Sequence, residues 1–168
     1  KEQKKAEAEK HQHEFFDNYL EYMLKGDYAT ASEHCRLADG IATAPDLKKY
    51  SDELSSVEKT ILESFGGDDG KYIAVETRDG RKMVKFKKVK GSSIYYEVKI
   101  GKGIAQEKTS VKNLAFSEKT RRLAPKVQPE AILLYSMWYA VQCGKPEQIA
   151  KYIDKLPRGL QDAVNRKI

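Results

Sequence analysis

Between residues 71 and 110, apolar and polar side chains alternate so that every second residue lies on one face, as in a half-buried β-strand. Turn residues divide this stretch. Asp79-Gly80 is a strong two-residue hairpin signal, and glycine-containing triplets follow at residues 91–93 and 101–103. The inward positions of the first two strands are Ile73, Val75, Thr77, Val84 and Phe86. The pattern predicts short antiparallel strands joined by tight turns.

The alternation continues into a third strand, whose inward positions are Ile94, Tyr96, Val98 and Ile100. Residues 104–110 predict a weaker fourth strand, because polar residues stand on both of its faces, and we expect it at the sheet edge. Four such strands form a meander that can curl toward a small SH3-like barrel. The side chains expected to close its end are Val111, Leu114 and Leu123.

The sequence before the sheet is helical in pattern. Residues 1–14 carry no large apolar side chain and predict a solvated helical lead, whereas residues 15–24 present a wide apolar face. Gly26 stands where a helix ends and Asp27 where the next begins, so a short returning helix is predicted up to Ala38. Residues 47–65 are apolar at spacings of three and four, which predicts one further helix.

The sequence after the sheet is also helical in pattern. Pro129 suits the first turn of a helix, and residues 131–141 are apolar on nearly every face, so this helix should be central and covered from several sides. We therefore predict an α+β fold. A helical arm at residues 1–65 precedes an SH3-like β module at residues 71–124, and a closing helical pair at residues 129–168 packs on the first arm.

Charge is unevenly distributed along the 168 residues, whose formal net charge is +6. Residues 1–70 carry −7, residues 71–126 carry +11 and the remainder carries +2. The β module is thus the basic pole of the chain. No apolar run approaches the ~20 residues of a membrane-spanning helix, so we expect no membrane insertion. Because the first residue is Lys1, we expect a processed chain or a piece of a larger protein.

Residues that resemble catalytic or metal sites lack the required spacing. His11 and His13 are two apart on a predicted helix and point about 200° away from each other, so both cannot face one ion. The glycines before Lys71 resemble a phosphate-binding loop but are one residue short. Cys35 and Cys143 are expected to be buried free thiols. We assign no catalytic residue, metal or cofactor, and an enzyme with an unrecognised site stays as an alternative.

Basic and aromatic side chains are interleaved on the predicted strands, which indicates a candidate partner-binding face. Its residues are Arg81, Lys82, Lys85, Lys87, Lys88, Tyr95 and Lys99. An acidic protein or peptide segment is the expected partner, and the acidic arm of the same chain is a second source of one. Aromatic stacking with phosphate contacts would instead suit single-stranded nucleic acid. A solvated face whose lysines protect an edge is the third interpretation.

Two stretches resemble known families. Asp79-Gly80-Arg81-Lys82, Val111, Leu114, Ser117-Glu118 and Leu123 are similar to the end of the SH3-like homology domain found in an endocytic adaptor and in bacterial envelope proteins. The hairpins around Gly26 and Gly144 resemble single tetratricopeptide-like units. The first resemblance implies a peptide-binding module. We therefore expect a non-enzymatic interaction or scaffolding domain of a larger bacterial protein, with a sensory appendage as one setting.

Overall fold

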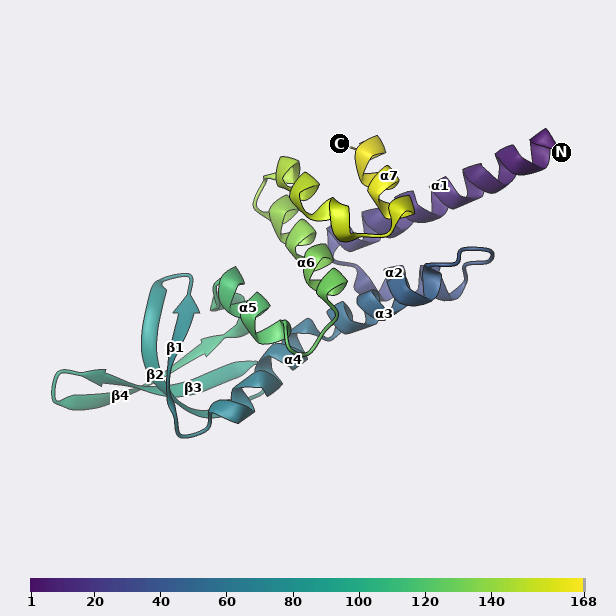
Figure 1. Cartoon of the computed structure of the whole chain (residues 1–168). Coiled ribbons are helices and arrows are strands. Elements are labelled where there is room, and N and C mark those ends of the chain that lie inside the picture. The colour runs from purple at the N-terminus through teal and green to yellow at the C-terminus, as the bar shows by residue number, and fades with distance from the viewer. Residues whose placement is uncertain (168) are drawn as a thin grey trace. The chain divides into compact units, whose positions relative to one another are not determined.

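The computed structural model describes residues 1–167 and has an α+β fold, in which helices flank a four-stranded antiparallel sheet (Figure 1). This confirms the predicted fold class. The chain forms two compact units. The helical unit comprises residues 1–55 and the residues from Val127 onward, and the β unit comprises residues 56–126. The β unit thus begins within the segment that the sequence pattern assigned to the helical arm.

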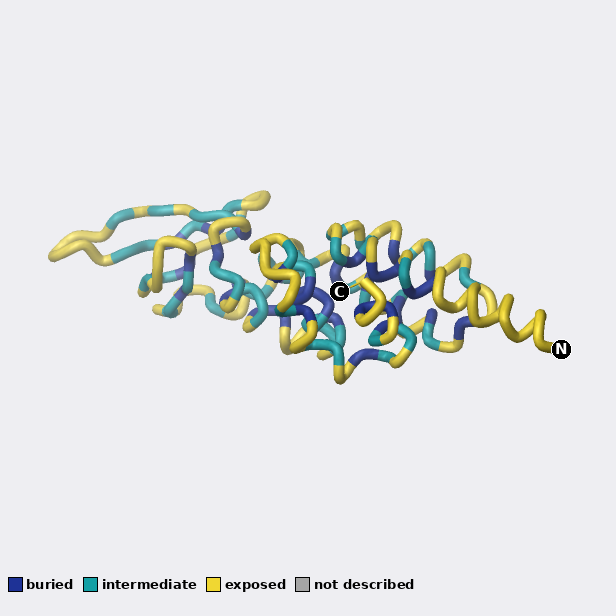
Figure 2. The backbone as a smooth tube through the Cα atoms, turned by 90° about the horizontal axis from the view of Figure 1, so that it is seen from above, coloured by how far each residue is buried: buried dark blue, intermediate teal, exposed yellow. Residues whose placement is uncertain are grey.

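The helical unit opens with a helical hairpin of α1 (Glu2–Lys25) and α2 (Tyr28–Arg36), followed by α3 (Ala44–Ser55). Gly26 ends α1 in the left-handed conformation with φ 75°, and the Asp27 carboxylate accepts a hydrogen bond from the Thr30 amide. Both predicted caps are confirmed. Figure 2 shows that residues 1–14 are exposed on all sides, as expected for a solvated lead.

The second half of the helical unit consists of α6 (Pro129–Gln142), a 3₁₀ segment (Pro146–Lys155) and α7 (Arg158–Lys167). α6 packs against α1 and α3, and α7 packs against α1. The approach of α7 requires Gly159, since a Cβ there would lie 2.2 Å from the Phe16 ring. After Gly144 the chain returns as the 3₁₀ segment, and Trp138 of α6 is half-buried.

The core of the helical unit is built from side chains that are almost fully inaccessible: Tyr19, Leu20, Met23, Leu47, Leu54, Leu134, Met137 and Leu160. The Tyr19 hydroxyl donates to the Leu47 carbonyl at 2.9 Å and accepts from the Ser51 hydroxyl at 3.0 Å. The phenol is therefore satisfied inside the core, where an unpaired hydroxyl would be costly.

The β unit starts with α4 (Val57–Ser64) and a 3₁₀ turn (Phe65–Asp68). The strands follow as β1 (Tyr72–Thr77), β2 (Gly80–Lys90), β3 (Ser93–Ile100) and β4 (Gly103–Ser110), paired in the order β1-β2-β3-β4. A 3₁₀ turn (Val111–Asn113) and α5 (Phe116–Leu123) complete the unit. The meander and the edge position of β4 are as predicted.

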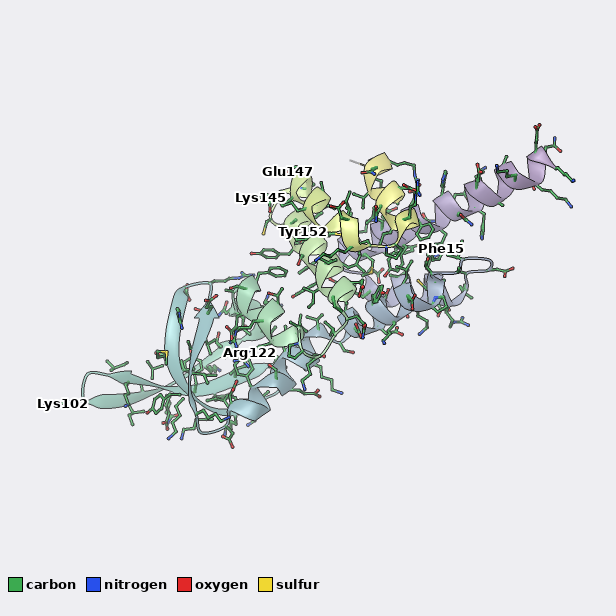
Figure 3. The ribbon with its side chains drawn as sticks, in the orientation of Figure 1. Phe15, Lys102, Arg122, Lys145, Glu147 and Tyr152 are labelled. Carbon is green, nitrogen blue, oxygen red and sulfur yellow. The ribbon has the colours of Figure 1, made fainter. Side chains whose placement is uncertain are left out.

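One face of the sheet packs on the helices of the β unit. Its core consists of Ile61, Phe65, Val75, Val84, Phe86, Ile94, Tyr96, Val111, Leu114 and Leu123. Ile100 was expected on this face but is 61% exposed. β2 pairs with β3 only as far as Lys85↔Glu97, and beyond that point β3 pairs with β4 alone. The tip of this hairpin, where Figure 3 labels Lys102, therefore extends past the core.

One predicted helix is corrected, and the structure contains one helix that the sequence pattern did not predict. The single helix expected at residues 47–65 is divided between α3 and α4 at Ser56. There the Ser55 hydroxyl donates to the Asp52 carbonyl at 2.7 Å, which is the local competition through which serine interrupts helices. The sequence pattern also did not predict α5, because its buried positions include the charged residues Glu118 and Arg122.

Candidate binding sites

The strand register places a group of aromatic and basic side chains on the sheet face opposite the core. Tyr72 pairs with Lys85, Lys85 pairs with Glu97, and Lys88 pairs with Tyr95. We call this surface the basic sheet face and define it by Tyr72, Lys85, Lys87, Lys88, Tyr95 and Lys99. Five of the seven predicted site residues lie here, and Tyr72 is the one that sequence reasoning missed.

Tyr72 is the centre of the basic sheet face. Its side chain is 47% exposed, and the ammonium groups of Lys85 and Lys99 lie 5.8 Å and 4.9 Å from the ring centroid. These distances are within the range of cation–π attraction. The alternation that places Ile73 inward also places Tyr72 outward, so the signal was present in the sequence. What the sequence did not show is that lysines from β2 and β3 converge on this ring.

A second aromatic and basic pair lies along the same face. The Lys88 ammonium is 5.5 Å from the Tyr95 ring centroid. Next to it Lys87 forms an ion pair of 3.2 Å with Glu97, which also accepts a 2.9 Å hydrogen bond from Gln106. The Lys87 hydrogen bond, assisted by that from Gln106, holds the pKa of Glu97 below its ordinary value. The Glu97 carboxylate beside the basic sheet face is therefore already paired with Lys87.

The structure separates the other two predicted residues from this surface. Lys82 pairs with the buried Val75 and lies on the opposite side of the sheet, where its ammonium is 3.9 Å from the Glu107 carboxylate of β4. The pleat places Arg81 on the same sheet face as Lys85, but four residues further along β2, where it lines a pocket at the β1 end of the sheet. The structure therefore brings five of the seven predicted residues together and leaves Arg81 and Lys82 outside the cluster.

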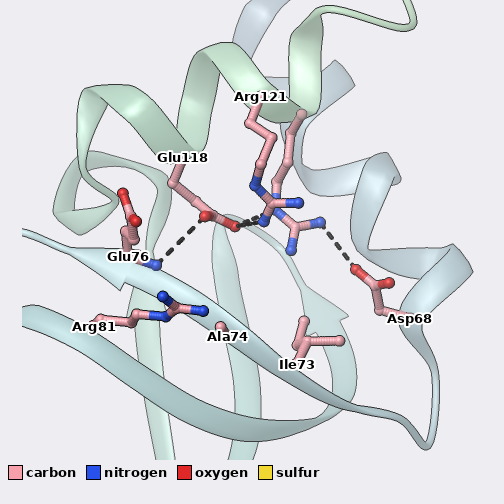
Figure 4. A pocket seen from close by; sticks show the side chains of 8 residues that line it. Asp68, Ile73, Ala74, Glu76, Arg81, Glu118 and Arg121 are labelled. Atoms are coloured by element: carbon pink, nitrogen blue, oxygen red, sulfur yellow. Dashed lines mark hydrogen bonds and ion pairs between the residues drawn. The ribbon is translucent and has the colours of Figure 1, made fainter.

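The pocket beside Arg81 has a volume of about 420 Å³ and lies between the sheet and α5 (Figure 4). We call it the arginine pocket. Its walls combine three arginines, three carboxylates and two small or apolar side chains: Asp68, Ile73, Ala74, Glu76, Arg81, Glu118, Arg121 and Arg122.

The inner wall of the arginine pocket is a buried network of charges. The side chains of Glu118 and Arg122 are 2% and 5% exposed and pair at 2.8 Å. Arg122 also reaches Asp68 at 3.1 Å, and its guanidinium lies 3.5 Å from the centroid of the Phe65 ring. These contacts join α5 to the turn before β1. Because each buried charge has a partner, the network can form a rigid wall of the pocket.

The helical unit has a smaller pocket of about 210 Å³, lined by His11, Glu14, Phe15, Asn18, His34, Leu37 and Ala38. His34 donates from Nε2 to the Phe15 carbonyl at 3.0 Å and stacks on the Phe15 ring with a centroid distance of 4.7 Å. The His34 imidazole therefore packs α2 against α1 within the hairpin. Over residues 1–167, no cluster of three or more His, Cys, Asp or Glu side chains is arranged to hold a metal.

The two thiols differ in environment. Cys35 is buried, and desolvation raises the pKa of its thiol to about 12. Cys143 is exposed, which corrects the expectation of two buried thiols. Cys143 is the C-cap residue of α6 and lies directly after the last residue of that helix.

Comparisons of the chain with protein-family models, curated proteins and solved structures returned no match. In the described part of the chain, no helix combines the length and apolar character needed to cross a bilayer.

Proposed function

We propose that the β unit is a non-catalytic binding module whose basic sheet face takes an acidic segment of a partner protein. The observation that carries this proposal is Tyr72, an exposed ring with one lysine from β2 and one from β3 beside it. Such an arrangement offers an apolar contact surface and two cations at one point. In a larger protein the module would serve interaction or scaffolding.

Charge supports an acidic partner. Residues 56–126 contain 17 basic and 9 acidic side chains, a net charge of +8. Surface ion pairs contribute only about 0 to 1 kcal/mol each, so several contacts and an aromatic anchor are needed for measurable binding. The basic sheet face supplies these contacts, since it combines four lysines with the two aromatic rings of Tyr72 and Tyr95. Affinity should be modest and should fall with salt.

The test uses the full chain and a fluorescent peptide of about a dozen residues that alternates Glu with apolar residues. A matched peptide carries Gln in place of Glu. Anisotropy at about 50 and 200 mM salt should show binding of the acidic peptide at micromolar concentration, weaker at high salt, and little binding of the Gln peptide. The variants K85E and K99E should each weaken binding by about tenfold, as loss and reversal of a contact charge should do.

Lys112→Glu is the matched control, because Lys112 is exposed in the same unit but lies after β4 and outside the basic sheet face. It makes the same change in net charge. Equal loss of binding in K112E and K85E would mean that overall charge, and no defined site, attracts the peptide. That result, or no binding of the acidic peptide at all, would contradict the proposal.

Nucleic acid is the competing partner, since Tyr72 and Tyr95 with their lysines also suit base stacking and phosphate contact. We expect no binding of a single-stranded DNA or RNA oligonucleotide beyond weak, sequence-independent attraction. Micromolar binding that is lost between about 50 and 200 mM salt and weakened by Tyr95→Ala would replace the peptide proposal, because a stacked base contributes about 1 to 3 kcal/mol.

A further inference from the structure

We propose that the arginine pocket binds a carboxylate group, held between Arg81 of β2 and Arg121 of α5. The site is distinct from the basic sheet face and does not depend on peptide binding there. The inference follows from the balance of hydrogen-bond donors and acceptors in the pocket.

The carboxylates of the pocket are already occupied. Glu118 accepts from Arg121, from Arg122 and from the Glu76 amide, the last at 3.4 Å. Asp68 accepts from Arg122 at 3.1 Å, and Glu76 accepts from the Ser117 hydroxyl. Each carboxylate in the walls is therefore already engaged by a neighbour within the β unit.

The donors are in excess. The Arg81 side chain makes no hydrogen bond or ion pair with any residue in the described range 1–167, and it offers five N–H groups. Arg121 is 60% exposed and donates from Nη2 to Glu118, which leaves its remaining donors for a ligand. Figure 4 shows the two guanidiniums reaching into the pocket from the strand and from the helix.

The chemistry of the walls favours a carboxylate over other ligands. A guanidinium presents parallel N–H groups that match the two oxygens of a carboxylate. The wall contains three arginines and three carboxylates and is balanced, so one negative charge is tolerated, whereas a doubly charged phosphate would meet three carboxylates at close range. Ile73 and Ala74 provide an apolar contact for a short aliphatic chain. A cation would be repelled by the Arg81 guanidinium, which has no partner carboxylate among the described residues, and by the exposed Arg121 guanidinium.

The experiment is an NMR titration of the full chain that follows the Nε–Hε signals of its arginines, with butyrate, which has one carboxylate and a short aliphatic chain, as the probe at constant ionic strength. Shifts should saturate at Arg81 and Arg121, while the uncharged analogue butyramide should leave both signals in place. Arg81→Gln should weaken butyrate binding by about tenfold or more, the effect of losing a charge-assisted hydrogen-bonded pair. Lys85→Gln on the basic sheet face should leave it unchanged.

An unaltered amide spectrum of R81Q away from the pocket establishes that the variant is folded, as expected for an exposed side chain. Shifts that grow without saturation, that appear equally with butyramide, or that persist in R81Q would overturn the proposal. The source of the carboxylate is distinguished by two further probes. The α-amide of N-acetylglutamate, which keeps only the side-chain carboxylate, represents an acidic side chain, and N-acetylalanine, whose one carboxylate is the α-carboxylate, represents a chain terminus. Tighter binding of one identifies the source.

Discussion

At the residue scale, Gly26 meets two requirements that no residue with a Cβ atom could meet together. It adopts φ 75° to end α1, and a Cβ at this position would lie 2.8 Å from Nε1 of Trp138. Trp138 in turn stacks on Tyr135, with ring centroids 5.3 Å apart. The glycine therefore permits both the end of the helix and the close approach of the indole.

We predict that Gly26→Ala destabilises the chain by about 2 to 3 kcal/mol, from the strained left-handed backbone and from displacement of the indole. Gly40→Ala is the control, because Gly40 has φ 71° but no atom within 4 Å of the added Cβ. It should cost only about 1 kcal/mol. Chemical denaturation of both variants gives the comparison, and equal losses would show that the Trp138 contact contributes nothing.

Thiol labelling gives a second prediction at this scale. Cys143 is exposed, whereas burial raises the pKa of Cys35 to about 12. At pH 8 Cys143 should react rapidly with a thiol-specific reagent, whereas Cys35 should react only on unfolding. Because the unfolded thiol ionises at lower pH than the folded one, this group reduces stability as pH rises above its ordinary pKa. Rapid labelling of both thiols in the folded chain would refute the assignment.

At the element scale, α5 is held by buried charges as well as by the apolar side chain of Leu123. Glu118 contacts the β1 backbone, and Arg122 connects α5 to the turn that precedes β1. In this way one short helix protects the outer edge of β1, where the Ala115 amide also donates to the Glu76 carbonyl at 2.9 Å. The same contacts build the inner wall of the arginine pocket.

Glu118→Gln should therefore cost about 3 to 5 kcal/mol, because it leaves the buried Arg122 without its principal carboxylate partner. Glu63→Gln is the control. Its side chain is 67% exposed and its partner Lys59 lies 3.8 Å away, so the loss should be below about 1 kcal/mol. Urea denaturation of both variants measures the difference. A loss in E118Q as small as that in E63Q would mean that the network does not stabilise α5.

At the scale of the whole molecule, the chain leaves the helical unit after Ser55 and returns to it at Val127. The Gln128 amide donates to the Glu53 carboxylate at 2.9 Å, so the two ends of the intervening segment meet. The helical core thus combines residues from both ends of the sequence, whereas the β unit is one continuous segment of the chain.

This arrangement predicts that residues 56–126 fold alone and that the helical unit folds when a short glycine linker replaces them. Each piece should give a cooperative thermal transition, since each has its own buried core. Residues 1–55 without the residues from Val127 onward should not, because α6 covers α1 and α3. A cooperative melt of residues 1–55 that is unchanged by adding the later helices would contradict the single helical core.

The sequence by itself determined what depends on near neighbours in the chain. Alternation and the Asp79-Gly80 turn predicted the strands, and Gly26 with Asp27 marked the helix boundary, since both signals act within a few residues. Only the tertiary structure decided which side chains meet. The two lysines beside Tyr72 come from two other strands, and the Glu118–Arg122 pair, which is local in sequence, is buried against Asp68 and the Glu76 backbone, more than forty residues away. Contacts between residues so far apart in the chain are not encoded by any repeating pattern of neighbouring residues.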